Sequence, residues 1–171
     1  MAAIGDEAEL VVLDDFFQSA ECQIHDRVSL MSVGRATLEP LETRCAIALR
    51  LAMWERHTLQ PAAEATFGAG IKTIRQIGSY NCRRIRTPDG NSSQMSTHAT
   101  ADAIDITGFD LTDGRRIRLT SGWNGEPDEA EFLRDARDGA CRWFKAVLSP
   151  DFNALHDDHF HLQSRGWRTC R

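Results

Sequence analysis

Apolar residues recur at helical spacing in two stretches of the chain. The first stretch ends at Gly68 and Gly70 after an interruption at Pro61, and its apolar positions are Leu41, Cys45, Ala48, Leu49, Ala52 and Met53. The second stretch covers residues 129–147 and ends before Pro150, with an apolar side formed by Phe132, Ala136, Ala140, Trp143, Phe144 and Val147. Both stretches are predicted to be helices, although Gly139 weakens the second by about 1 kcal/mol relative to Ala.

Three other stretches have the composition or alternation of β-strands. Residues 71–77 are rich in residues that favour strands, and residues 159–162 form a short extended piece. Residues 104–119 contain two alternating runs around Asp113 and Gly114, and an Asp-Gly turn in that position is typical of a β-hairpin. The order helix, strand, hairpin, helix, strand predicts an α+β fold with a small antiparallel sheet flanked by helices.

The remaining segments have weaker patterns. Residues 10–17 can begin a helix, and residues 22–38 are expected to be a loop with short extended pieces. Residues 87–93 are expected to be a loop because of their Pro, Asp, Gly, Asn and Ser content. A chain of 171 residues without a long linker suits one domain. We expect residues 1–21 to be an N-terminal extension with some helix, and residues 22–171 to form that domain.

The net charge argues against a nucleic-acid-binding domain, and the hydropathy argues against a membrane-spanning helix. The 25 acidic and 20 basic residues give a net charge of −5, which argues against a nucleic-acid-binding domain. The longest unbroken apolar run covers residues 45–49, far short of the roughly 18 residues that a membrane-spanning helix needs. The opening MAAIGDEAEL has neither the basic start nor the apolar core of a signal peptide. We therefore expect a cytosolic protein or the trimmed, mature part of an exported one.

The five cysteines leave two interpretations open. They are Cys22, Cys45, Cys82, Cys141 and Cys170, and no Cys-x-x-Cys pair is present. That spacing disfavours a structural zinc knuckle and a thioredoxin-type motif. The cysteines can be buried free thiols that pack like small hydrophobic residues. Alternatively, they can form disulfides in an extracytoplasmic domain, because disulfides persist in oxidising compartments.

Four of the six histidines lie in two short polar stretches, residues 96–105 and residues 156–161. Neutral imidazoles combined with a carboxylate are ligands typical of zinc. On a strand, His159 and His161 would point to one face about 6.6 Å apart, so we expect one to be a ligand and the other its neighbour. His98 and Asp105 can share a metal only if the chain turns between them. Asp105 lies in an otherwise apolar strand, where an unpaired carboxylate is costly and a cation would relieve that cost.

These stretches carry a resemblance to a known superfamily. The pattern Ser-x-His-x-x-x-x-Ala-x-Asp followed by His-x-His resembles the zinc peptidases that include lysostaphin-type endopeptidases, D-alanyl-D-alanine carboxypeptidases and the hedgehog signalling domain. Within this superfamily, the chain is most similar to the bacterial extensin-like C-terminal domain family, and the similarity extends from about Cys22 to Cys170. The motifs that carry this similarity are GSYNCRRI, STHATADAIDITGF, DGRRI, DGACRWF and DFNALHDDHFHL. The resemblance implies an antiparallel sheet flanked by helices and an extracytoplasmic location.

The resemblance also assigns roles to individual residues. It implies a Zn²⁺ ion held by His98, Asp105 and His161. Carboxypeptidase relatives have their catalytic carboxylate, more often Glu than Asp, at the position of Asp158, whereas endopeptidase relatives have a histidine at the position of His159. In a regular strand Asp158 would face away from His161, so it can serve only if the segment bends.

Four more positions bear on this comparison. Relatives carry a substrate-binding arginine near Arg83 and Arg84, and the planar fork of arginine suits a carboxylate. The alternative is a solvated pair of surface charges. Ser96 is expected to support the site through a hydrogen bond. Carboxypeptidase relatives usually have Gly where this chain has Ala101, which would stiffen the turn.

Together these features predict a zinc metallopeptidase that hydrolyses an amide bond in peptidoglycan stem peptides or cross-links. The ion would polarise the scissile carbonyl and lower the pKa of a water molecule, and Asp158 or His159 would accept the proton. One alternative is a metal-stabilised cell-wall binding module with little turnover. Another is a secreted structural or signalling domain with a vestigial site. The sequence leaves the native metal, the bond that is cut and the oligomeric state open.

Overall fold

A mostly antiparallel sheet organises the fold of residues 8–171, which are the residues that the computed structural model describes. Nine strands of these residues form the sheet in the order β1-β4-β5-β6-β9-β12-β11-β13, with β10 paired to β9. The strands are β1 (Ala8–Val12), β4 (Arg27–Val33), β5 (Ala36–Arg44), β6 (Ile71–Gly78), β9 (Ala103–Leu111), β10 (Arg116–Arg118), β11 (Ala146–Leu148), β12 (Phe160–Gln163) and β13 (Thr169–Cys170). The β5–β6 and β11–β13 pairs are parallel. The sheet is therefore larger than the small sheet that the sequence predicts.

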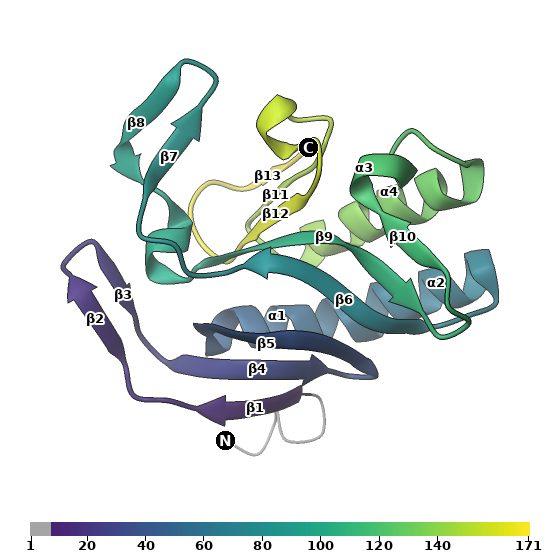
Figure 1. The fold of residues 1–171 in the computed structure, drawn as a ribbon, viewed down its shortest axis with the longest axis horizontal. Helices are drawn as coiled ribbons and strands as arrows, with labels where there is room; N and C mark the ends of the chain where they lie inside the picture. The colour runs from purple at the N-terminus through teal and green to yellow at the C-terminus, as the bar shows by residue number, and fades with distance from the viewer. Residues whose placement is uncertain (1–7) are drawn as a thin grey trace.

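Two β-hairpins project from the sheet. One is formed by β2 (Phe16–Ser19) and β3 (Cys22–Ile24), and the other by β7 (Arg84–Thr87) and β8 (Gly90–Met95). Figure 1 shows both hairpins at the same end of the molecule, with the β7–β8 hairpin above the β2–β3 hairpin. The β7–β8 hairpin follows β6 in the chain and precedes β9, the strand next to β6 in the sheet.

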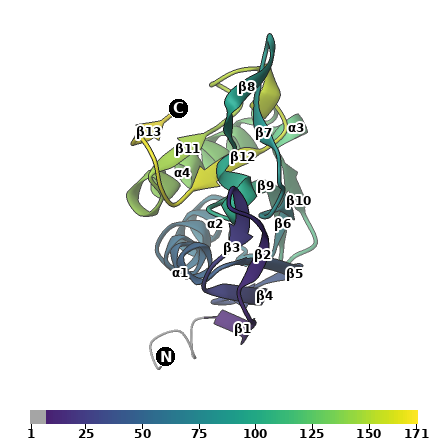
Figure 2. The same cartoon turned by 90° about the vertical axis from the view of Figure 1, so that its left-hand side faces the viewer.

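Helices cover one face of the sheet (Figure 2). A continuous helical path runs through α1 (Cys45–Trp54), a π-helical turn η1 (Glu55–Leu59) and α2 (Gln60–Phe67). Pro61 is the second residue of α2, directly after the π-helical turn, and the helical path continues through it. The other helical segments are the 3₁₀ turns η2 (Thr97–Thr100) and η3 (Ala154–His156), and the helices α3 (Leu119–Gly122) and α4 (Pro127–Trp143).

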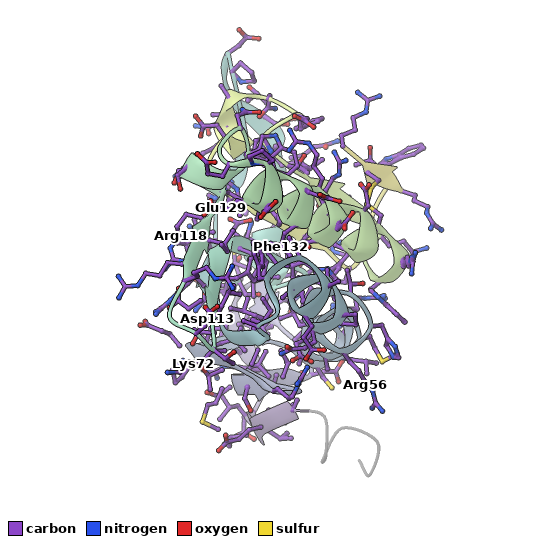
Figure 3. The ribbon with its side chains drawn as sticks, turned by 90° about the vertical axis from the view of Figure 1, so that its right-hand side faces the viewer. Arg56, Lys72, Asp113, Arg118, Glu129 and Phe132 are labelled. Carbon is purple, nitrogen blue, oxygen red and sulfur yellow. A yellow bond between two sulfur atoms is a disulfide. The ribbon has the colours of Figure 1, made fainter. Side chains whose placement is uncertain are left out.

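The core lies between the helices and the sheet. Trp54 of α1 contacts Phe109 of β9 edge to face, with ring centroids 5.9 Å apart, and Phe132 of α4 contacts Phe109 at 5.4 Å. Figure 3 shows Phe132 on the inner side of α4, with Arg56 at the periphery. Gly139 of α4 permits close packing, because a Cβ atom there would lie 2.1 Å from a methyl carbon of Thr58. The glycine that weakens α4 locally therefore lets α4 approach η1.

Several sequence predictions agree with this structure. The strand predicted at residues 71–77 is β6, and the Asp113-Gly114 turn joins β9 to β10 as an antiparallel hairpin. The extended piece at residues 159–162 corresponds to β12. The α+β class is confirmed.

Other predictions were wrong. The helix suggested at residues 10–17 is replaced by β1 and the start of β2, because β1 pairs with β4 along the edge of the sheet. Residues 22–38 contain β3, β4 and the start of β5 rather than mainly loop. Residues 87–93 form the turn and part of the β7–β8 hairpin. This two-stranded ribbon is mostly exposed, so it lacks the apolar alternation that identifies a half-buried strand.

The helix boundaries also differ from the predictions. The first helix begins at Cys45, because Leu41 belongs to β5 and pairs with Leu30 of β4. The last long helix ends at Trp143 rather than at Val147, since residues 146–148 form β11. The apolar residues of β11 continue the helical pattern by coincidence of spacing. No helix within residues 8–171 is both long and apolar enough to cross a bilayer.

Disulfides resolve the cysteine alternatives. Within the described chain, Cys22 is bonded to Cys82 and Cys141 to Cys170, while Cys45 is a free thiol. The Cα–Cα distances of 5.5 and 5.9 Å are normal for such bonds. Two disulfides indicate folding in an oxidising, extracytoplasmic environment.

Candidate metal centre

The sheet register places Asp105 and His161 side by side. Asp105 of β9 lies directly opposite His161 of β12 in an antiparallel pair. Their neighbours Ile104 and Leu162 also lie opposite each other and are fully buried in the core. Because successive side chains of a strand point to opposite faces, Asp105 and His161 share the face that is turned away from the core.

A tight turn brings His98 to the same place. The η2 segment contains His98, and Ser96 caps it by accepting a hydrogen bond from the His98 N–H at 3.3 Å. Ala101 then adopts a left-handed conformation with φ +50°, which reverses the chain into β9. The turn that the sequence required between His98 and Asp105 is therefore present, as is the hydrogen bond expected of Ser96.

The ligand atoms of His98, Asp105 and His161 all lie within 4.8 Å of one another. His98 Nε2 is 3.1 Å from Asp105 Oδ2 and 3.1 Å from His161 Nδ1. His161 Nδ1 is 2.9 Å from Asp105 Oδ1. Two imidazole nitrogens and a carboxylate thus converge on one point in a nearly buried position, and this group can hold a metal ion.

Neighbouring groups fix the tautomer of both imidazoles. His98 Nδ1 is 2.8 Å from the Ser79 carbonyl oxygen, which can only accept, so Nδ1 carries the proton. His161 Nε2 is 3.1 Å from Gln163 Oε1. The Gln163 amide is oriented by donating from Nε2 to the Arg165 carbonyl, so Oε1 faces His161 and accepts its proton. The lone pairs of His98 Nε2 and His161 Nδ1 therefore point to Asp105, as in metal sites whose ligands are oriented by outer partners.

The charge balance of this group depends on protons or a cation between its members. Burial alone would raise the pKa of Asp105, but the adjacent His161 and His98 rings, when they carry a proton toward the carboxylate, hold that pKa well below its usual range. When both rings are neutral, three electron-pair acceptors face one another without a proton between them. A cation held between these three groups would relieve this repulsion.

His159 and Asp158 lie beside the triad as a hydrogen-bonded pair. Asp158 Oδ1 accepts from His159 Nδ1 at 2.6 Å, which leaves the lone pair on His159 Nε2. That Nε2 is 3.7 Å from Asp105 Oδ1. Asp158 lies in the turn before β12, where the chain bends as its predicted role required. The structure thus places His159 next to the His98–Asp105–His161 group and Asp158 behind it.

A cleft of about 680 Å³ opens over these residues. The lining includes Asp105, His161, His159 and Asp158, and also Ser96. The β7–β8 hairpin supplies part of one wall, and the segment around η3 together with the loop after β12 supplies the opposite wall. Asp105 and His161 therefore border a space large enough for part of a peptide.

The two predicted arginines have different surroundings. Arg83 is half-buried and lines the cleft. Arg84 does not line it, and its guanidinium instead donates to the Ser93 carbonyl within the β7–β8 hairpin. Of the two, Arg83 is placed where it can contact a ligand.

The sequence reasoning missed three residues of the cleft. His156 lies in the same polar stretch as His159, and its ring centroid is 5.9 Å from that of His161. Burial and the nearby His161 and His159 lower the pKa of His156 to about 4, so its ring is neutral at neutral pH. Gln163, two residues after His161 on the same strand face, could have been found from that spacing. Arg86 lines the cleft, and no sequence signal separates it from the other arginines of its segment.

Comparisons with known proteins return one family. The family model described as "Extensin-like protein C-terminus" matches residues 4–171. A search of curated proteins and a search of solved structures return no match.

Proposed function

The chain belongs to the extensin-like C-terminal family, and from this premise we propose that it is a zinc-dependent peptidase of the superfamily that it resembles. Its proposed substrates are the stem peptides or cross-links of peptidoglycan, and its proposed location is the periplasm or cell envelope. The disulfides support an oxidising location.

One observation carries the proposed metal. The hydrogen bonds to the Ser79 carbonyl and to Gln163 Oε1 place a proton on the outer nitrogen of each imidazole, so the lone pairs of the neutral rings converge with the Asp105 carboxylate. Two nitrogens and one oxygen form a donor set typical of a catalytic zinc site that leaves one position open. His98, Asp105 and His161 would therefore hold the ion.

A bound zinc ion would polarise the scissile carbonyl and lower the pKa of a water molecule. His159 would accept the proton of this water at Nε2 and then deliver it to the leaving amine. Asp158 holds His159 in the required tautomer through the bond to Nδ1, so it acts as a positioning residue. Because His156 is neutral, it adds no positive charge beside the residues that would hold the ion. Arg83 would bind a substrate carboxylate with its planar fork.

Digestion of purified muropeptides by zinc-loaded protein, with products identified by mass, tests this proposal. The wild type should hold one zinc ion per chain and release defined fragments. His161→Ala should lose the ion, because two remaining protein ligands bind weakly. His159→Ala should keep the ion and lose about 10²–10⁴-fold in turnover, the usual contribution of a general base. Asp158→Asn should keep the ion and lose less turnover than His159→Ala.

The matched control is His25→Ala, because His25 is exposed and pairs with Asp15 away from the cleft. This variant should retain both zinc and turnover. Zinc binding without fragments from any muropeptide would contradict the peptidase and leave a metal-stabilised binding module. Full zinc content in His161→Ala, measured by elemental analysis, would contradict the ligand assignment.

A further inference from the structure

Two arginines in the cleft lack acidic partners. Arg83 and Arg86 both line it, and neither forms an ion pair with any residue in the described range 8–171. The hydrogen bond of Arg83 is a 3.3 Å contact from Nη1 to the Arg84 carbonyl. By contrast, Arg165 on the other side of the cleft is paired with Asp102 at 2.8 Å. The positive charge on the hairpin wall is therefore uncompensated.

The two guanidinium groups also act on each other. Burial lowers the pKa of Arg83, the positive charge of Arg86 lowers it further, and Asp105 partly opposes both effects. Arg83 is thus repelled by a like charge on the hairpin and attracted by the Asp105 carboxylate. A ligand with negative charge would relieve the repulsion between the arginines.

The backbone of the hairpin is irregular where it carries these residues. Arg84 pairs with Met95, but Arg86 pairs with Asn91, so β8 contributes two extra residues to this interval. Such irregularities occur beside active sites, where they change the direction of side chains. Here Ile85 and Arg86, which a regular strand would point to opposite faces, both line the cleft.

The opposite wall carries three apolar side chains among its polar ones. Phe152 and Leu155 are each 39% exposed, and Trp167 is 91% exposed on the loop that follows β12. All three line the cleft. A ligand lying between the walls would meet positive charge on one side and apolar surface on the other, as a peptide with carboxylates and short aliphatic side chains would.

We propose that Arg83 and Arg86 form a two-point anion subsite for an acidic peptide with two carboxylates. Arg83 binds the carboxylate nearer the metal-ligating group, and Arg86 binds a second one further out along the β7–β8 hairpin. The identity of the peptide as a peptidoglycan stem peptide rests on the proposed function, whereas the two-carboxylate requirement rests on the arginines.

Equilibrium binding of two synthetic peptides tests this subsite. The first is acetyl-Ala-γ-D-Glu-Lys-D-Ala-D-Ala, which has two carboxylates, and the second is the same peptide with the Glu α-carboxylate amidated. Binding is measured by titration calorimetry with zinc-loaded protein and again after removal of the metal with a chelator. The wild type should bind the diacid about tenfold more tightly than the amide, since charge-assisted hydrogen bonds are the stronger kind.

Arg86→Gln should abolish this preference and bind both peptides as the wild type binds the amide. Arg86→Lys should restore part of the preference, because it keeps the charge but loses the fork. The control is Arg116→Gln, which removes one positive charge from an exposed position on β10 outside the cleft lining. It should retain the full preference.

The subsite would be overturned if Arg86→Gln kept the preference for the diacid, or if Arg116→Gln lost it as fully as Arg86→Gln. The peptidase proposal can fail independently of the subsite. If zinc-loaded protein does not cleave the peptide, the preference for the diacid can still be measured. A preference that persists without zinc supports the arginine subsite whether or not the chain cleaves the peptide.

Discussion

At the scale of single residues, the site depends on a conformation that alanine adopts reluctantly. Ala101 has φ +50° and is fully buried at the turn that links His98 to β9. The left-handed region costs an L-residue about 1–2 kcal/mol, and glycine avoids this cost. The turn tolerates the strain because Ala101 N–H bonds to the His98 carbonyl and Asp102 N–H to the Thr97 carbonyl.

We expect Ala101→Gly to change the free energy of unfolding by less than about 1 kcal/mol, because relief of strain offsets the greater freedom of the unfolded chain. Ala99→Gly is the matched comparison, since Ala99 is equally buried but has no positive φ. It should be more destabilising by about 1 kcal/mol. Urea unfolding of both variants measures the difference, and an equal loss would mean that Ala101 is not strained.

Sequence reasoning reached the residues whose chemistry is unusual for their setting. Asp105 inside an apolar strand and His161 in a His-x-His pattern could be singled out without coordinates. Arg86 could not, because its relevance comes from an irregular strand pairing that no local pattern encodes. The Ser79 carbonyl that fixes His98 was equally inaccessible, since every residue carries the same backbone group.

At the scale of elements, a carboxylate joins three strands. Asp110 of β9 forms an ion pair with Arg75 of β6 and another with Arg118 of β10, the latter at 2.6 Å. Partial burial would raise the pKa of Asp110, but the hydrogen bonds and charges of these arginines lower it below its usual value. Asp110 therefore holds β10 and β6 to the strand between them.

This pairing predicts a pH-dependent contribution to stability. Because the pKa of Asp110 is lower in the folded than in the unfolded protein, its contribution is present above the unfolded value of about 3.9 and is lost as the pH falls through the folded value. Asp110→Asn should lower the free energy of unfolding by about 1–2 kcal/mol at pH 7. The difference from wild type should shrink below pH 4. Urea titrations at both pH values measure it, and a constant difference would contradict the pairing.

The elements that the sequence predicted poorly share a physical cause. Residues 10–17 and 87–93 lie in strands that expose most of their side chains, so burial imposes no alternation on them. Their structure comes from pairing with another strand, which is distant in sequence for β1 and adjacent in the β7–β8 hairpin. Elements that bury one side, such as α4 and β6, leave a periodic pattern that the sequence preserves.

At the scale of the whole molecule, two disulfides close long loops. They join residues separated by 60 and by 29 positions. Loop closure of this size stabilises a fold by about 3–4 kcal/mol per bond in the chain-entropy description. The Cys22–Cys82 bond also ties the β2–β3 hairpin to the segment that enters the cleft wall at Arg83.

We expect one titratable thiol per chain in denatured protein that was produced without reductant, and this thiol should be Cys45. Replacing Cys141 and Cys170 together by Ser should lower the free energy of unfolding by about 3 kcal/mol. Cys45→Ser is the control and should cost much less, because it breaks no bond. Thiol titration and urea unfolding test both statements, and three or more thiols would contradict the paired state.

The Cys141–Cys170 bond has a consequence for proteolysis. The closed loop contains β11, η3 and β12, and so it carries Asp158, His159 and His161 on one covalent ring. A protease that cuts once between the two cysteines adds the mass of one water but releases no fragment. The nicked protein would migrate as a single chain until a reductant separates it into two pieces. Exposed residues at 151–152, next to the cleft, offer a place for such a cut, after which the protein would be nicked yet undivided.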